Sequence, residues 1–441
     1  MLISKILFVS YLGLTASTGF IMPAITGTHS TQLAARVGII DSHIDFDGPL
    51  GDKAFKNEEC HLELDSQDLV CEISHGRNFH NQANQTTPAF INEQSADVVK
   101  YIELQEKKKK NGFLNIFDKS WMLEKQYDKD FVDQMMLYRK NAHGTHVAGI
   151  AAKNNDHIEL IQMSIIPFKS EPEQIPDLSA SEEKIPSPLS GQQMASIESY
   201  LENHLEAVSK QYDAIATYSK FFDIKVINGS YGIPGFRNTI LVKCLKNGVM
   251  PLETQLNYLE HKYTKKFNDV IKEKLEQSPD SLYIFAAGNS SEDIDKSPSM
   301  PASIKSDQMI TVASVSKKQT LSSFSCWGKK SVDIAAYGEN IRSTSPGNIE
   351  INMSGTSQAA PQVTNTASVL KDMKADLTPS EIKYILMNTV DHTLELREKV
   401  KSGGILSKVR AMKAVSLIKD GHSILEACEQ AYQDLPERYI S

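Results

Sequence analysis

The stretch Val37-Gly38-Ile39-Ile40-Asp41 is an unbroken apolar run that ends in an acid. Similar runs, rich in β-branched residues, recur at residues 224–228, 282–286, 309–313 and 332–335. Nearly unbroken apolarity is typical of strands that are buried on both faces, as in a parallel sheet covered by helices. The runs therefore predict a parallel sheet at the centre of the fold.

Helical patterns lie between these runs. Apolar residues recur at three- and four-residue spacing over residues 193–222 and 252–277, with charges elsewhere. Thr378-Pro379-Ser380-Glu381 predicts another helix start, with a capping threonine, a proline in the first turn and a capping-box glutamate. The alternation predicts a three-layer α/β fold, in which a mainly parallel, doubly wound sheet has helices on both faces.

Two segments interrupt this alternation. Residues 48–130 are polar, charge-rich and weakly periodic, and residues 170–191 are rich in Pro, Ser and Glu, which predicts a long surface loop. Strand runs continue on both sides of each segment. We therefore predict one domain over residues 30–441, with insertions at about 48–130 and 170–191 and a C-terminal helical extension at about 415–441.

The amino terminus has the pattern of a secretory signal peptide. Lys5 precedes an apolar stretch, residues 6–14, and small residues follow at 16–19. We predict a signal peptide over residues 1–27, with its cleavage site open, and a secreted or periplasmic protein. The alternative is an ordinary buried N-terminal helix. Later segments fall short of about 18 uninterrupted apolar residues, so we expect no stable membrane insertion after signal removal.

The composition limits the partners. The chain has 441 residues, of which 40% are hydrophobic and 23% charged, and its formal net charge is -8. This charge argues against nucleic acid as a partner, because such a binder needs a concentrated basic face. The one basic run, residues 107–110, is predicted to be a solvated loop. We expect protein or peptide partners, and the oligomeric state stays open.

Five cysteines are present, an odd number. Cys60 and Cys71 lie close together in a polar stretch, and an exported protein could pair them. Cys244, Cys326 and Cys428 are scattered, without metal-ligand spacing, and are expected to be free buried thiols.

Three short motifs follow one another along the chain: Ile39-Ile40-Asp41-Ser42-His43, then Asn141-Ala142-His143-Gly144-Thr145-His146, then Ser354-Gly355-Thr356-Ser357. In residues and in order they resemble the three catalytic segments of the subtilisin family of serine peptidases, also called subtilases or peptidase family S8. The resemblance implies a subtilisin-like fold and a secreted serine endopeptidase that works through an acyl-enzyme intermediate.

The resemblance also assigns roles, and the chemistry explains them. A serine hydroxyl needs a base within hydrogen-bond reach, so Ser357 is the expected nucleophile and His143 the general base. Asp41 is expected to orient that base. The sequence predicts a helix that begins at His143, and another that opens at Gly355 and runs to about Met373. A nucleophile at a helix N-terminus has free backbone N–H groups beside the developing oxyanion.

Two further segments extend the resemblance. Phe285-Ala286-Ala287-Gly288-Asn289 follows a strand run and matches the family's oxyanion segment, so Asn289 is expected to donate its side-chain amide to the oxyanion. Residues 226–232 resemble the family's substrate-pairing strand. The resemblance implies that substrate adds as a strand to Ser230, Tyr231 and Gly232, and that the primary specificity pocket is lined by Ala286, Ala287 and Gly288.

Several residues depart from the family pattern. His43 stands where glycine is general, so a bulky side chain is expected to crowd that turn; Tyr337 replaces a proline and Gln358 a hydrophobic residue. The interval from Asp41 to His143 is unusually long, and the stretch before the first strand is too short for a folded pro-domain. The nearby His146 is expected to be a packed helix residue and Asp45 to be structural.

The chemistry implied by the resemblance requires no cofactor, and we predict no metal ligand in the site. The family also binds calcium, and residues 154–156 (Asn-Asn-Asp) lie where one such site is common. One short polar loop is weak support for a structural calcium, because that ion takes about six to eight oxygen ligands.

Two other functions compete with the endopeptidase. The first is a catalytically silent subtilisin fold that binds a partner through its groove or insertion, suggested by the departures at His43, Tyr337 and Gln358. The second is another acyl-transfer hydrolase such as an esterase. That class places its serine in G-x-S-x-G, and Ala359 stands where the second glycine is needed.

Overall fold

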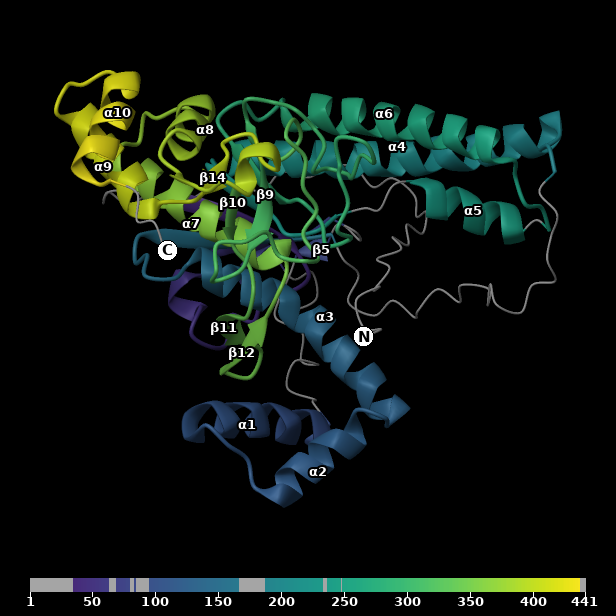
Figure 1. The fold of residues 1–441 in the computed structure, drawn as a ribbon, viewed down its shortest axis with the longest axis horizontal. Helices are drawn as coiled ribbons and strands as arrows, with labels where there is room; N and C mark the ends of the chain where they lie inside the picture. Colours follow the sequence, from purple (N-terminus) through teal and green to yellow (C-terminus); the bar gives the residue numbers. More distant parts are fainter. Residues whose placement is uncertain are drawn as a thin grey trace.

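A ten-stranded sheet forms the centre of the computed structural model, which describes residues 35–62, 69–79, 83–84, 95–165, 187–232, 236–246 and 248–436 (Figure 1). The strands pair in parallel from β14 to β4, and β13 and β5 pair antiparallel at the two edges. Their order is β13 (Asp391–His392), β14 (Gly404–Ile405), β10 (Ile334–Tyr337), β9 (Met309–Val315), β8 (Leu282–Ala286), β7 (Val226–Gly229), β1 (Ala35–Asp41), β6 (Ile158–Ser164), β4 (Gly76–Asn78), β5 (Ala83–Asn84).

The order of the strands reverses beside β1. Strands β4 and β6 lie on one side of it, and β7, β8, β9 and β10 follow in sequence order on the other. The sheet is therefore doubly wound, as predicted, and the carboxyl end of β1 lies at the switch point, where open α/β sheets bind ligands.

The unbroken apolar runs are explained by burial on both faces of the sheet. In β8, Leu282, Ile284 and Ala286 join a core cluster with α3 (Lys129–Ala151), α7 (Thr356–Met373) and α9 (Lys408–Lys419). The alternate residues Tyr283 and Phe285 join a second cluster with α4 (Gly191–Phe221) and α6 (Glu253–Leu275). Because successive side chains of a strand point to opposite faces, both sets must be apolar. The three-layer α/β prediction is confirmed.

The helices that cover the sheet follow the sequence signals. Ser190 caps α4 with a capping box to Gln193, and Thr378 caps α8 in the same way with Glu381. The predicted helix at Gly355 is α7. The covering helices are α3 (Lys129–Ala151), α4 (Gly191–Phe221), α5 (Phe236–Lys246), α6 (Glu253–Leu275), α7 (Thr356–Met373), α8 (Pro379–Met387), α9 (Lys408–Lys419) and α10 (Ile424–Asp434).

Helix α3 does not begin at His143, so that prediction is wrong. It begins at Lys129, because the side chain of Asp128 accepts a hydrogen bond from the N–H of Phe131 and caps the helix there. His143 therefore lies well inside a 23-residue helix. Its first half leaves the body of the molecule, and the second half packs beneath the sheet (Figure 1).

The insertion at residues 48–130 contains regular structure. A 3-10 turn (Gly51–Lys53) and strand β4, which extends the main sheet, come from it. It also holds a separate antiparallel pair, β2 (Asn57–Leu62) and β3 (Leu69–Ser74). Its last part forms helices α1 (Ala96–Asn111) and α2 (Ile116–Lys125), which lie at the bottom of the view in Figure 1, beyond the hairpin of β11 (Ile341–Ser345) and β12 (Ile349–Met353).

Some predictions fall on other parts of the chain. The signal peptide over residues 1–27 lies outside the described residues, and so does most of the 170–191 loop. Within the described ranges, no helix is both long and apolar enough to span a bilayer.

Cys244, Cys326 and Cys428 are free and buried, as predicted. Cys60 and Cys71 lie directly opposite each other in the β2–β3 register.

Candidate active site

Asp41 ends β1 at the carboxyl edge of the sheet and is fully buried. Its Oδ1 accepts hydrogen bonds from the backbone N–H of Ser42, at 2.7 Å, and from Nδ1 of His143, also at 2.7 Å. The second oxygen, Oδ2, has no hydrogen-bond partner among the described residues. A carboxylate can only accept, so the proton of this bond belongs to Nδ1, and Nε2 is the free basic nitrogen of His143.

The pKa of His143 is the result of opposed effects. Burial lowers the pKa of His143. The negative charge of Asp41 and the hydrogen bond to it together raise the pKa by more than burial lowers it, so the net pKa lies above the ordinary imidazole value. The side chain of His143 keeps 22% exposure, while that of Asp41 has none. His143 thus has one face toward its buried partner and one toward solvent.

Gly144 permits this pairing by letting α3 lie against the turn after β1. A Cβ at Gly144 would lie 2.5 Å from the carbonyl oxygen of His43 and 2.8 Å from that of Ser42. The N–H of Gly144 donates to Oγ of Ser42 at 2.9 Å. A larger residue would push the helix, and with it His143, away from Asp41.

Ser357 lies in the first turn of α7, after the N-cap Gly355. Its backbone N–H therefore has no acceptor within the helix. Its hydroxyl donates to the carbonyl oxygen of Ser230 at 3.1 Å, and in the described residues no hydrogen bond joins it to His143. The hydroxyl of Ser230 in turn donates to the carbonyl oxygen of Ser357 at 2.9 Å. The structure therefore shows the Ser357 hydroxyl bonded to Ser230 and not in the expected serine–histidine bond.

Asn289 follows β8 and is exposed. Its Oδ1 accepts from the backbone N–H of Thr356 at 2.9 Å and from the Thr356 hydroxyl at 3.0 Å. Since a backbone N–H can only donate, these bonds fix which amide atom is oxygen, and Nδ2 is left to donate on the other side. Gly288, at φ +109°, makes the turn that carries Asn289 there.

Thr356 was missed by the sequence analysis as a functional residue. Besides holding Asn289, its Oγ1 accepts from the N–H of Gly288 at 3.1 Å. Asn228 was missed as well: its Nδ2 donates to Oγ of Ser230 at 2.9 Å, and its Oδ1 accepts from Thr364 of α7 at 3.0 Å. Thr356 lies inside the motif that holds Ser357, and Asn228 inside the segment 226–232. A polar side chain inside these segments was the sequence signal that could have identified both residues.

The predicted substrate-binding residues lie on two neighbouring strand ends. Ser230, Tyr231 and Gly232 continue past the end of β7 without ladder partners among the described strands. The Tyr231 side chain is turned inward: its hydroxyl bonds that of Tyr212 in α4, and its ring meets the edge of Phe285.

Ala286 and Ala287 are buried at the end of β8, and Gly288 is half-buried. Their place at the border of a specificity pocket stays a prediction.

His43 does not obstruct the site. Its ring is buried, and its Nδ1 lies 3.2 Å from Nε2 of Gln162 and 3.4 Å from Oγ of Ser164. Oε1 of Gln162 accepts from the N–H of Ile44, so Nε2 is the donor and Nδ1 of His43 the acceptor. His43 and Ser164 form a serine–histidine contact near Asp41. Ser164 ends β6 opposite Asp41 and is fully buried, however, so no substrate reaches it and we interpret this contact as structural.

The other polar residues near the motifs are structural, in line with the sequence analysis. His146 is fully buried, its Nε2 lies 3.1 Å from the carbonyl oxygens of Ile341 and Ile351, and burial lowers its pKa to about 4. Asp45 accepts from the N–H of Gly347 at 3.0 Å. Both residues fasten the β11–β12 hairpin to the body.

The loop at residues 154–156 does not fit a calcium ion. Nζ of Lys53 donates to the carbonyl oxygen of Asn155 at 2.7 Å and to Oδ1 of Asp156 at 3.2 Å. The side chain of Asn155 is itself committed, to Ser368 and to the N–H of His157. The chain's own ammonium group thus lies on the oxygens that a cation would need. Within the described ranges, no cluster of acidic, histidine or cysteine residues could hold a metal.

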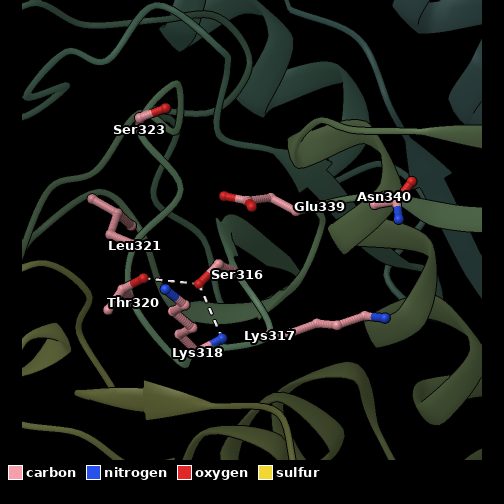
Figure 2. Close-up of a pocket in the computed structure, with 8 residues that line it drawn as sticks. All are labelled: Ser316, Lys317, Lys318, Thr320, Leu321, Ser323, Glu339 and Asn340. Carbon is pink, nitrogen blue, oxygen red and sulfur yellow. Dashed lines mark hydrogen bonds between the residues drawn. The ribbon is translucent and has the colours of Figure 1, made fainter.

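Figure 2 shows a pocket of about 470 Å³ on the loop after β9, lined by residues of the 316–323 segment together with Glu339 and Asn340. The N–H of Asn340 donates to Oγ of Ser354 at 2.8 Å, so the pocket borders the segment that leads to Ser357. The predicted catalytic residues do not line it.

Comparison with known proteins agrees with this geometry. A family model described as "Subtilase family" matches residues 34–411. "Subtilisin-like protease 2" of Plasmodium falciparum is 42% identical over 90 residues, which are 20% of this chain and 7% of that protein. "Subtilisin-like protease 1" of Trichophyton rubrum is 46% identical over 85 residues, 19% of this chain and 16% of that protein. The matches thus span only a small part of these relatives.

Solved structures are similar at a lower level. A cold-adapted subtilisin-like serine proteinase has a TM-score of 0.44 and 18% identity, covering 84% of this chain and 89% of that one. A lanthipeptide protease has a TM-score of 0.49 and 14% identity, covering 86% and 88%.

Proposed function

Because the chain belongs to the subtilase family, we propose that it is a serine endopeptidase that hydrolyses peptide bonds through an acyl-enzyme intermediate. The observation that carries the proposal is the 2.7 Å bond from Nδ1 of His143 to the buried Asp41, which leaves Nε2 unprotonated and able to act as a base. Ser357 is the nucleophile in this proposal.

The proposed reaction begins when the Ser357 hydroxyl rotates from the carbonyl of Ser230 toward His143. Oγ attacks the substrate carbonyl carbon while its proton passes to Nε2, and Asp41 stabilises the imidazolium. His143 then returns the proton to the leaving amine as the C–N bond breaks. Water hydrolyses the acyl-enzyme by the same steps, which releases the carboxylic acid and restores the serine.

The oxyanion is stabilised by two donors in this proposal. One is Nδ2 of Asn289, directed by the bonds from Thr356 to Oδ1. The other is the backbone N–H of Ser357, which the helix leaves without an acceptor. Both are fixed before substrate arrives, so little reorganisation is needed in the transition state.

We propose further that protein or peptide substrates bind in an extended form. Ser230, Tyr231 and Gly232 would pair with the substrate backbone, because they continue a strand beyond its last ladder partner. Ala286, Ala287 and Gly288 would border the side-chain pocket. Export rests on the sequence pattern at residues 5–19, and N-terminal sequencing of the protein from culture medium or periplasm tests it.

A fluorophosphonate probe tests the proposed nucleophile. We expect the folded protein to be labelled at Ser357, and the Ser357→Ala variant to lose both labelling and caseinolysis. Ser354→Ala is the matched control, since Ser354 is exposed three residues away and should leave labelling intact. Ser164→Ala should also retain labelling. Labelling that depends on Ser164 instead would overturn the assignment.

The silent-fold alternative has one observation in its favour, the Ser357 hydroxyl bonded to Ser230 rather than to His143. An apo enzyme often shows such geometry, and the rotation concerns one side chain. Correctly folded protein that binds the partner but resists the probe at all pH values would support this alternative.

A further inference from the structure

The turn between α1 and α2, together with the start of α2, exposes three large apolar side chains. Phe113 is 68% exposed, Ile116 76% and Phe117 82%, and we call these three residues the apolar tip. None of the ten residues of α2 is buried. Short helices in proteins are normally held by burying an apolar face, so a helix with such side chains in water lacks the surface that would cover it.

The tip is held in place by a packed base. Leu114, within the same turn, is buried, and Val98 and Ile102 of α1 pack with Phe131 and Tyr138 of α3 in one cluster. Helices α1 and α2 and the first half of α3 form a unit that we call the projection. Because the projection has its own core, the exposed side chains are held by an ordered support.

Basic residues surround the tip. The run at residues 107–110 is the last turn of α1, not the predicted loop, since the helix continues to Asn111 and ends at Gly112 in the left-handed region. Lysines are favourable at a helix C-terminus, which explains why the run stays helical. Lys107 pairs with Asp118 at 2.6 Å. Lys108, Lys110 and Lys119 are exposed and have no carboxylate partner among the described residues.

Exposed apolar side chains and exposed lysines occur together in this part of the chain. The chain carries a net charge of -8, yet free lysines gather beside the apolar tip. Leu123 and Tyr127 are also exposed, at 58% and 84%, so the segment 113–127 presents five large apolar side chains. Five are still far fewer than the 20–30 residues a side of a stable protein interface of about 800 Å² per partner. Aromatic and aliphatic side chains beside lysines suit the boundary of a bilayer, where rings enter the headgroup layer and lysines meet anionic lipids.

We propose that the apolar tip and its lysines dock the protein peripherally on an anionic membrane surface. The docking involves no spanning segment and is independent of the peptidase chemistry proposed above.

Vesicle flotation with the full chain tests the proposal. The protein should float with vesicles of phosphatidylcholine mixed with phosphatidylglycerol, more strongly than with phosphatidylcholine alone, and less so as salt rises. Phe113→Ser/Ile116→Ser/Phe117→Ser should lower the partition coefficient at least about tenfold on both vesicles. Lys108→Glu/Lys110→Glu should lower it by about fivefold per lysine on the anionic vesicles only.

The matched control is Leu394→Ser/Val409→Ser/Leu425→Ser, at sites 82%, 66% and 55% exposed on other parts of the molecule. It should leave flotation unchanged. The apolar stretch at residues 6–14 is present in every variant, so differences report the tip alone. If the triple tip variant does not fold, Phe117→Ser alone should give a smaller decrease in the same direction.

Two results would overturn the proposal. One is equal flotation of the tip variants and the unmodified chain. The other is concentration-dependent self-association in sedimentation velocity that the tip variants abolish, without flotation of the unmodified chain, which would assign the tip to a second copy. Cleavage of a soluble peptide should be the same in all variants, so a failure here is separate from a failure of the peptidase proposal.

Discussion

Replacing Asn289 by alanine tests the oxyanion site most directly. The change removes Nδ2, one of two donors, and the loss of one such donor in subtilisin costs about 2.7–4 kcal/mol of transition-state stabilisation. We therefore expect kcat on a fluorogenic peptide to fall by about 10²–10³, with KM nearly unchanged, because the donor acts mainly in the transition state.

Thr356→Val sharpens the test, because Thr356 acts only through its neighbours in this proposal. The variant loses the 3.0 Å hydroxyl bond to Asn289 and the acceptor for the N–H of Gly288 but keeps the 2.9 Å backbone bond. One hydrogen bond contributes about 0.5–1.5 kcal/mol, so kcat should fall by up to about tenfold.

The double variant decides whether Thr356 positions Asn289. If it does, Asn289→Ala/Thr356→Val should be hardly slower than Asn289→Ala alone, since there is no amide left to orient. Active-site titration corrects each rate for misfolded protein. Full additivity would refute the positioning role, and an unchanged kcat in Asn289→Ala would refute the oxyanion assignment itself.

Three other outcomes follow from the site. His143 must be neutral to act as a base, and its pKa is raised, so the acidic limb of the kcat/KM profile should lie at a pH above the ordinary imidazole pKa. In Asp41→Asn the limb should move to lower pH and the maximum of the profile should be much smaller. A limb below the ordinary imidazole pKa in the unmodified protein would contradict the pairing of His143 with Asp41. Gly144→Ala places a methyl group 2.5 Å from the carbonyl oxygen of His43, so the free energy of unfolding should fall by at least about 1 kcal/mol, and Tm and kcat should fall with it. An unchanged Tm would show that the contact relaxes without cost. Chelation with EDTA should change Tm equally in the unmodified chain and in Asp156→Ala because Lys53 occupies the loop at residues 154–156, whereas a drop confined to the unmodified chain would reveal a cation site in that loop.

The sequence predicted the sheet well because burial on both faces leaves a clear mark. The apolar run at 282–286 coincides with β8, and the run ending at Asp41 with β1. Strand β4 was hidden, since three residues are too few for periodicity to show. The start of α3 was missed although Asp128 is a good cap, because the polar, charge-rich segment around it has little helical periodicity.

The motifs predicted the contact between Asp41 and His143 that the structure shows, whereas the role of Ser357 stays a prediction. Order and spacing of motifs carry no information on a hydroxyl rotamer, and the bond of Ser357 to Ser230 came only from the structure. The crowding expected at His43 does not occur, because Gln162 and Ser164 on the neighbouring strand accommodate the ring. Such compensation depends on residues more than a hundred positions away.

Helix α3 connects two parts of the molecule that the sequence keeps separate. It starts in the packed base of the projection at Lys129 and reaches His143 fourteen residues later, a rise of about 21 Å along one axis. A helix of this kind is a stiff rod, so the projection cannot tilt without turning the segment that carries the imidazole. If the protein docks on a surface as proposed, the direction in which it meets that surface would also fix the direction in which His143 faces.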